Sequence, residues 1–460
     1  LLLTHRWGVD EAASRARIAL ALPFLTDLAL LCGIGWFYAR YGTQNLATLL
    51  PILHTNPGWT VRSIVLGSVL LFVGVAGRLA LWPLSGWVTM TSTTAPTAAS
   101  AIVLSAWSVI GIVVLYRLTP IFAASNNQTL QVFLAACAVS AVAAGVISLV
   151  GNGPRRVIAL AASGAVAVAA AVVINNAYHP SAAFAIAGVA AVFAIAPARA
   201  AALLAASTIA NAMRTDDLAE MGEAWRRMRA SSGALLVSTI VMGLATTGAL
   251  ALGVSSRSRL GVALGEGVLL VAVGAMRVFF GASLGILRRR RAFDPDRVRE
   301  PEGARGFPYW LALVGAALLI ASLVPGWLSF LDGQKHPTAA PLAIAVWAVP
   351  AIAGFGACAA AFARSRDGAL ALSAFGGAFL RRYAAGGLGV VDRFLVGPTT
   401  DAARRVGDWI PRGDGALGRF ATASGQLALA AGRAPALPIV LGLAIVLAIV
   451  LALAAPGIAR

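Results

Sequence analysis

Long apolar runs constrain this chain more than any other feature of its sequence. Because no water inside a bilayer can pair with the backbone, each run must satisfy its peptide groups within a helix. A span needs about 20 residues to cross roughly 30 Å of hydrocarbon. Runs of that kind lie near residues 19–40, 62–83, 96–118, 130–150, 156–177, 182–205, 233–254, 260–285, 309–331, 340–363 and 437–457. The sequence therefore predicts an all-α, polytopic transmembrane helix bundle of about eleven spans.

Composition excludes a water-exposed globule. Hydrophobic residues make up 59% of the chain and charged residues 12%, and the mean hydropathy is +0.83. Such values are typical of membrane proteins. The net charge of +18 comes almost entirely from arginine, Lys335 being the only lysine. The arginines gather between apolar runs, where the positive-inside rule and anionic headgroups account for them. We therefore expect a multi-pass protein of the cell membrane that contacts the lipid bilayer and no nucleic acid.

The cysteine pattern supports neither a disulfide framework nor a metal centre. Cys32, Cys137 and Cys358 fall singly inside apolar runs, without C-x-x-C spacing. Nothing resembles a G-x-G-x-x-G fingerprint on a strand or a paired-histidine haem site. We expect no metal, no cofactor and no redox site in this chain, so that any enzymatic activity would belong to a larger assembly.

Charge inside the apolar runs marks the candidate site. Arg78 lies in an apolar helix that meets Pro83, and another apolar helix begins at Pro96. A charge at bilayer depth is costly and by default marks an ion or proton path, and a proline there breaks the helix where its backbone can line a cavity. We assign Arg78 to a proton path or to a buried charge, with a snorkelling side chain as the alternative. Asp27 and Glu266 are acids within apolar helices, and for both we expect pairing with arginine rather than free proton exchange.

A polar segment divides the C-terminal part of the chain. Residues 364–436 are rich in Gly, Arg and Asp and too polar to span the bilayer. Their mixture of apolar residues and arginines predicts an amphipathic helix along a surface, and a disordered linker is the alternative. We divide the chain into a transmembrane bundle over 1–363, a cytoplasmic-side amphipathic region over 364–436 and a C-terminal anchor helix over 437–460.

Two runs flank the predicted helix break: residues 77–87 (GRLALWPLSGW) and residues 95–101 (APTAASA). They resemble the G-K-S-A-Q-x-P-L-x-x-W-L and G-P-T-P-V-S-A-L segments of the antiporter-like subunits of respiratory complex I, above all the L subunit of bacterial NADH:quinone oxidoreductase. Residues 154–159 (PRRVIA) are similar to D-I-K-R-V-L-A-Y, and residues 253–257 (GVSSR) to G-F-F-S-K-D-E. Residues 387–398 (GLGVVDRFLVGP) resemble the stretch before that family's lateral helix. No motif is intact, but the order is kept along the whole chain.

The resemblance implies residue roles. The family has sixteen membrane helices, so eleven spans would mean that the first five are missing. Arg78 and Arg257 stand where the family has lysines in two broken helices, and Arg199 stands in for the lysine of H-x-x-x-H-A-F-F-K. Arg257 is as well explained as a snorkelling residue near a loop. Leu104 and Ser105 are the nearest counterparts of a missing histidine. Since arginine keeps its proton where lysine can lose it, these exchanges favour fixed charge over proton carriage.

The implied function is that of a membrane-arm subunit of a proton-pumping NADH:quinone oxidoreductase. Such a subunit conducts or gates protons across the membrane while quinone is reduced elsewhere in the complex, and its partners are the other membrane subunits. Related subunits of a hydrogenase, a cation/proton antiporter or a bicarbonate-uptake complex remain alternatives. A degenerate paralogue with a purely scaffolding role is another.

The alternation of basic connections predicts a topology that labelling can test. We expect the loops holding Arg226 and Arg288–Arg291 to face the cytoplasm and Arg460 to lie outside. In a variant whose three cysteines are replaced by serine, a cysteine at Arg226 should resist an impermeant maleimide added to intact cells, and one at Asn126 should react. The reverse pattern would show that the orientation is inverted.

Overall fold

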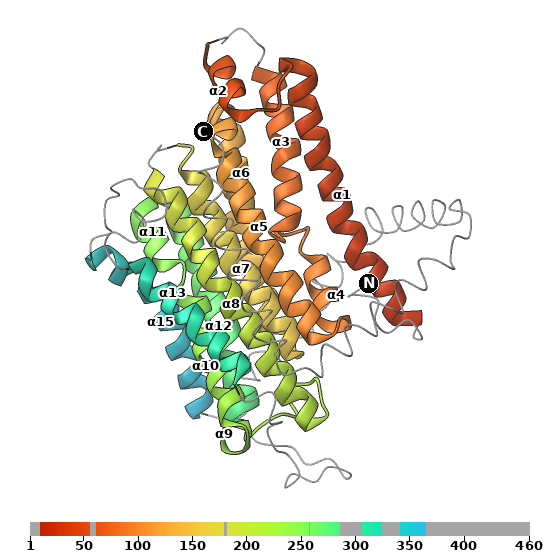
Figure 1. Ribbon diagram of the computed structural model, residues 1–460. Helices are drawn as coiled ribbons and strands as arrows, with labels where there is room; N and C mark the ends of the chain where they lie inside the picture. Colours follow the sequence, from red (N-terminus) through yellow and green to blue (C-terminus); the bar gives the residue numbers. More distant parts are fainter. Residues whose placement is uncertain are drawn as a thin grey trace.

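The computed structural model describes residues 10–55, 61–178, 182–256, 258–285, 306–323 and 341–364. Within these ranges the chain is helical and has no strand (Figure 1). The amphipathic region predicted over 364–436 lies outside the described residues except for Arg364, and so do the anchor over 437–460 and Arg257.

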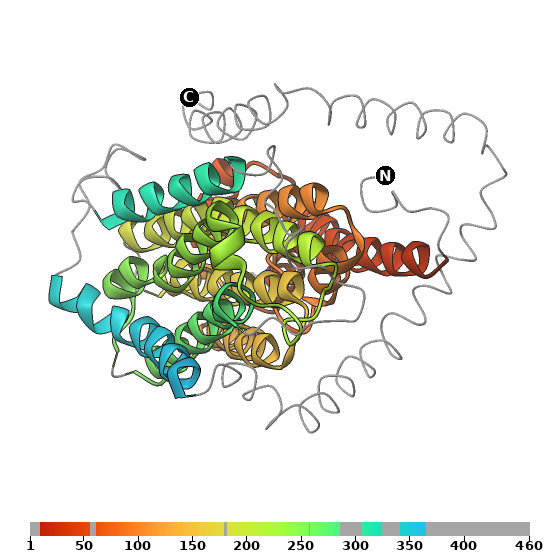
Figure 2. The same cartoon turned by 90° about the horizontal axis from the view of Figure 1, so that it is seen from below.

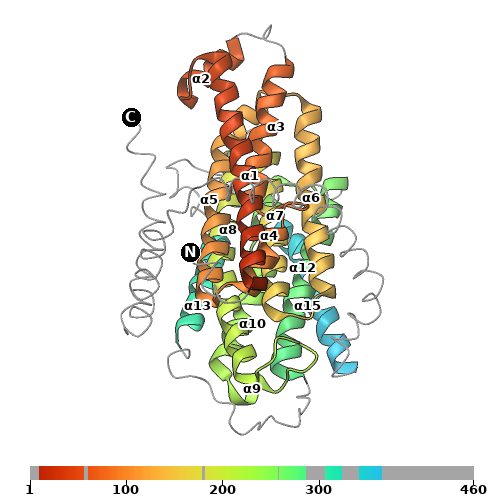
Figure 3. The same ribbon diagram turned by 90° about the vertical axis from the view of Figure 1, so that its right-hand side faces the viewer.

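The N-terminal helices form one flank of the bundle. Helix α1 (Asp10–Tyr41) runs antiparallel to α3 (Val61–Arg78), and the short α2 (Leu46–Thr55) follows α1 in sequence and lies beside the two helices at one end (Figure 1). Helix α4 (Gly86–Thr94) follows α3 after a break and also packs against α1 (Figure 3). The predicted span near 62–83 is thus a shorter apolar helix that ends at Arg78.

Four long helices form the centre: α5 (Thr97–Ala123), α6 (Asn127–Val150), α7 (Pro154–Asn175) and α8 (Ala182–Met213). Helix α7 is buried along its membrane-spanning length and packs against α5, α6, α8 and α12 (Arg259–Phe279). Its sequence after the first turn is almost entirely Ala, Val, Ile, Gly and Ser. A helix that is apolar all round is suited to burial, and small side chains let neighbouring helices approach closely where lipid supplies no hydrophobic driving force.

The later helices complete the other flank. The short α9 (Ala224–Arg227) precedes α10 (Arg229–Leu244), which continues through a turn into α11 (Thr247–Gly253). Helix α12 runs into a π-helical turn, η2 (Phe280–Leu284). Helices α13 (Phe307–Leu323) and α15 (Pro341–Arg364) lie on the outside, with α15 on the flank opposite α1 (Figure 2).

The predicted spans are confirmed within the described residues. Eight helices are long and apolar enough to cross a membrane, and two shorter apolar helices, Ile64–Arg78 and Phe307–Ser322, coincide with two further predicted runs. The eleventh run, near 437–457, lies outside the described residues. The chain is therefore a multi-pass helical membrane protein.

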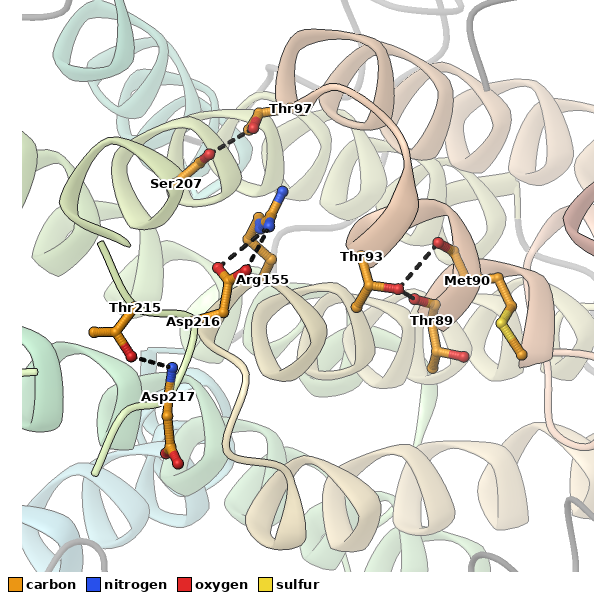
Figure 4. Close-up of polar contacts among 9 residues, drawn as sticks. All are labelled: Thr89, Met90, Thr93, Thr97, Arg155, Ser207, Thr215, Asp216 and Asp217. Atoms are coloured by element: carbon orange, nitrogen blue, oxygen red, sulfur yellow. Dashed lines mark hydrogen bonds and ion pairs between the residues drawn. The ribbon is translucent and has the colours of Figure 1, made fainter. Parts of the chain in front are cut away.

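At one end of the bundle, hydrogen bonds and an ion pair join the α6–α7 connection, the segment between α8 and α9, and the residue that follows η2. Asn152, between α6 and α7, accepts a hydrogen bond at its carbonyl from Leu218 N at 2.9 Å, and Glu223 N donates to Gly285 O at 3.1 Å. Arg155 pairs with Asp216 at 3.1 Å (Figure 4). Helix α9 lies at this end, and α2 lies at the opposite one (Figures 1 and 3). The connections that hold Arg155 and Arg226 are thus on one side of the bundle; which side of the membrane that is stays a prediction.

Glycines set the distance between α1 and α3. A Cβ atom at Gly77 would overlap the Thr26 side chain, and one at Gly74 would overlap Leu30 Cβ. Backbones that approach this closely leave no room for a methyl group. The same approach brings Asp27, next to Thr26, alongside the C-terminal end of α3.

We expect Gly77→Ala to lower the thermal unfolding midpoint of the full chain in mild detergent. Overpacking of this kind costs about 1–3 kcal/mol, whereas an unhindered helical glycine gains stability from alanine. The matched control is Gly35→Ala, because a Cβ at Gly35 on α1 would meet no other atom within 4 Å. Equal midpoints for the two variants would contradict close packing at Gly77.

Candidate functional site

The break between α3 and α4 lies directly after Arg78. Residues 79–85 are not helical and include Pro83, whose ring fixes φ and removes a backbone donor. The end of α3 keeps its hydrogen bonds: Leu79 N donates to Val75 O and Leu81 N to Ala76 O, both at 2.9 Å. The buried indole of Trp87 donates from Nε1 to Gly77 O at 2.9 Å. These contacts satisfy three carbonyls at the end of α3, those of Val75, Ala76 and Gly77.

Arg78 and Asp27 form an ion pair across α3 and α1. Arg78 Nε lies 2.8 Å from Asp27 Oδ1, and the two side chains are 25% and 35% exposed. Both positions lie within apolar helices, where each charge alone would be costly. The remaining nitrogens of the Arg78 guanidinium make no hydrogen bond among the described residues. The pair is thus held at one point of contact.

Arg199 on α8 is the most deeply buried candidate, with 1% of its surface exposed. Its Nη1 donates to Leu104 O at 3.2 Å and to Ser108 Oγ at 3.1 Å, on α5. Its Nη2 donates to Ala159 O at 3.0 Å and to Ser163 Oγ at 3.2 Å, on α7. Its Nε has no partner. One guanidinium therefore links three central helices.

The two serines act as acceptors toward Arg199. Ser108 Oγ donates its own hydrogen to Leu104 O, and Ser163 Oγ donates to Ala159 O, both at 2.9 Å. A hydroxyl that donates back to its own helix still has lone pairs for an incoming donor. No carboxylate pairs with Arg199 among the described residues. Its charge is therefore stabilised by dipoles alone.

Helix α5 brings the two arginines close to one another. A Cβ atom at Gly111 would lie 3.4 Å from Arg78 Cβ. Ser108, which binds Arg199, is three residues away, about 4.5 Å along the helix axis. Arg78 and Arg199 thus approach α5 within about one helical turn of each other. The sequence-predicted residues that the structure gathers are Asp27, Arg78 and Arg199.

The other candidates lie elsewhere. Pro96 separates α4 from α5, and the following Thr97 forms a hydroxyl contact with Ser207 of α8 (Figure 4). Glu266 is exposed on the outer face of α12 and forms no ion pair among the described residues, so the pairing expected for it is not found there. Arg257 lies outside the described residues.

A further arginine, Arg277 on α12, is also fully buried. Its Nη1 donates to Ser148 O at 3.2 Å and also to Leu149 O, and its Nη2 donates to Asn152 Oδ1 at 3.3 Å. These carbonyls belong to the last turn of α6, which has no intrahelical donors left and carries the negative end of the helix dipole. Arg277 therefore caps α6.

Sequence reasoning missed Ser108 and Ser163 as partners of Arg199. Apolar helices carry many serines whose hydroxyls bond their own backbone, as Ser108 and Ser163 also do. The sequence offered only a weak signal for these partners. Each serine lies in an apolar helix next to the one that carries Arg199. Leu104, one of the two expected counterparts of a family histidine, binds Arg199 through its backbone carbonyl.

We expect Ser108→Ala to lower the thermal unfolding midpoint, because it removes an acceptor from a buried cation. Hydrogen bonds to charged groups contribute about 1.5–3 kcal/mol. Ser105→Ala on the same helix is the control, since the buried Ser105 hydroxyl has no partner to lose. A larger loss from Ser105→Ala than from Ser108→Ala would contradict the assigned contact.

Comparison with known proteins agrees with this architecture. The family described as "NADH:quinone oxidoreductase/Mrp antiporter, TM" matches residues 1–281. A respiratory complex I structure from Thermus thermophilus with bound NADH is similar at 17% identity and a TM-score of 0.59, covering 76% of this chain and 72% of that one. The Mrp complex from Dietzia sp. DQ12-45-1b is similar at 16% identity and a TM-score of 0.53, covering 75% and 68%. No curated protein matches. The chain belongs to the NADH:quinone oxidoreductase/Mrp antiporter transmembrane family.

Proposed function

We propose that this chain is a membrane-arm subunit of a proton-pumping NADH:quinone oxidoreductase, in which fixed positive charge gates the passage of protons. Quinone would be reduced elsewhere in the complex. Family membership and the multi-pass fold support an antiporter-like membrane subunit of complex I or Mrp-type assemblies. One observation carries the finer proposal: an arginine–aspartate pair lies at a broken helix, within about one turn of a fully buried arginine along α5.

The proposal goes beyond the pairing expected for Asp27 from the sequence and adds proton exchange at that pair. A guanidinium stays protonated under nearly all conditions, so Arg78 cannot hand its proton on. Asp27 can accept a proton, and doing so removes the charge that Arg78 Nε binds at 2.8 Å. Protonation of Asp27 would then release Arg78, and loss of that proton would restore the pair. In this proposal Arg78 sets the field, and Asp27 takes up and releases the proton.

Arg199 would act as a fixed charge beside that exchange. Its four acceptors hold the guanidinium in place, and none of them is an acid that could take its proton. A buried cation repels other cations strongly because few screening waters surround it. Arg199 would therefore oppose uncoupled leakage of positive ions past α5 and favour negative charge at Asp27.

Two alternatives have support of their own. The similarity to the Mrp complex is comparable to that to complex I, so a cation/proton antiporter assembly is the second candidate. A scaffold role is favoured by the absence of lysine and histidine from the described membrane spans. Assemblies that contain a hydrogenase or take up bicarbonate are further possible contexts. Identifying the subunits that co-purify with a tagged chain would decide among the assemblies.

The conducting role can be tested with substitutions at Arg78. Complexes purified through a tag on this chain are reconstituted in proteoliposomes, and proton uptake is followed with a pH-sensitive dye. We expect Arg78→Lys to retain or increase uptake, because charge is kept and titratability is gained. Arg78→Ala should reduce uptake or assembly severalfold, because it leaves Asp27 as an unpaired charge.

The control is Arg117→Ala, which removes an arginine that is exposed on α5 and forms no hydrogen bond or ion pair among the described residues. It should leave uptake unchanged. If Arg78→Ala left both assembly and proton uptake at wild-type levels, the conducting proposal would be overturned and the scaffold role would take its place.

A further inference from the structure

A long groove runs along the outside of α6. It encloses about 760 Å³ and follows one face of α6 from Gln131 to Val150. At 1.5 Å per helical residue this is roughly 28 Å, close to the thickness of a bilayer's hydrocarbon core. Its other walls are the break between α3 and α4, the first turns of α7 and the start of α12. Most of the lining side chains on α6 are Ala, Val, Leu or Ile, so the groove suits an apolar occupant.

Arg156 lies at one end of this groove, beside Val150. Its side chain is partly buried and forms no hydrogen bond or ion pair among the described residues, and its buried Nε has no partner. The neighbouring Arg155 pairs instead with Asp216, on the connection that follows α8 (Figure 4). Two adjacent arginines thus differ: one is neutralised by an acid, and the other lines an apolar groove with its charge unmatched.

The setting of Arg156 favours a phosphate group. A guanidinium binds phosphate oxygens through paired hydrogen bonds. Arg156 lies in the first turn of α7, where the positive end of the helix dipole also attracts anions. Basic pockets between transmembrane helices on the cytoplasmic side bind anionic lipid headgroups, and this end of the bundle carries the basic connections. The positive charge of Arg156 and the long apolar groove therefore favour an occupant with an anionic head and an apolar tail.

We propose that this groove binds one anionic phospholipid, with its phosphate on Arg156 and an acyl chain along α6 beside Trp82 and Pro83. A transmembrane helix of a partner is a poorer fit, because its apolar surface would leave the Arg156 guanidinium at the end of the groove without an anionic partner. Residues Trp82 to Thr89, which follow Arg78, form one wall of the groove. A bound acyl chain would thus pack against the break that holds Arg78. This inference does not depend on proton conduction.

Lipid retention provides the test. The assembly is purified in mild detergent through a tag on this chain, and phospholipids are counted per chain by mass spectrometry. Arg156→Gln should lose an anionic phospholipid that the wild type retains, and Arg155→Gln, the matched control, should keep it. After delipidation, micelles containing phosphatidylglycerol should raise the unfolding midpoint, with about tenfold weaker apparent affinity in Arg156→Gln. Phosphatidylcholine micelles and inorganic phosphate alone should not raise it.

A second pair of variants tests the acyl chain. Ala143→Trp fills the groove and should displace the lipid, whereas Val132→Trp, on the same helix at a position 64% exposed and outside the groove, should not. Unchanged lipid content and unchanged response to phosphatidylglycerol in both Arg156→Gln and Ala143→Trp would overturn the proposal. Cross-linking of a cysteine at Val139 to another subunit, or to the C-terminal part of this chain, would also overturn it.

Discussion

The buried guanidinium of Arg199 needs hydrogen-bond acceptors, and this need determines how the central helices pack around it. Arg199 has almost no access to solvent, so the protein must supply its acceptors, and it does so from two carbonyls and two hydroxyls on α5 and α7. An unmet charge at that depth would cost far more than the local bending needed to meet it. The requirement fixes α8 relative to both neighbours. It also explains why α7 is made of small residues: only closely packed helices can present carbonyls from two sides to one side chain.

The described part of the chain places three arginines at depth and balances each differently. Arg78 pairs with a carboxylate, and Arg277 donates to the last carbonyls of α6. Arg199 donates to carbonyl and hydroxyl groups and pairs with no acid among the described residues. Only the first arrangement includes an acid. Removing one partner of a buried pair leaves an uncompensated charge, whereas a cation bound by carbonyls has no partner that can change its ionisation. The three arginines therefore differ in how their charge is balanced although they share a residue type.

Hydropathy predicted the spans well because bilayer thickness sets their length and the backbone must pair internally. The break after Arg78 followed from Pro83, whose effect on a helix is local. We expected Asp27 to pair with an arginine, but the sequence did not show that this arginine is Arg78. That pairing depends on how closely Gly77 of α3 lets α1 approach. The acceptors of Arg199 could not be read from the sequence, because two are backbone carbonyls and any apolar helix could offer them. Glu266 shows the same limit: an acid in an apolar run does not reveal whether it faces a neighbouring helix or the outside.

Helix α1 packs chiefly against α3 and α4, and its other side is an apolar outer face that includes Leu31, Ile34 and Tyr38. Helix α1 carries Asp27 to Arg78, and an axial displacement of one helical turn, about 5.4 Å, would separate the two charges. The ion pair therefore depends on the axial register of α1 against α3, which the close contacts at Gly74 and Gly77 hold in place.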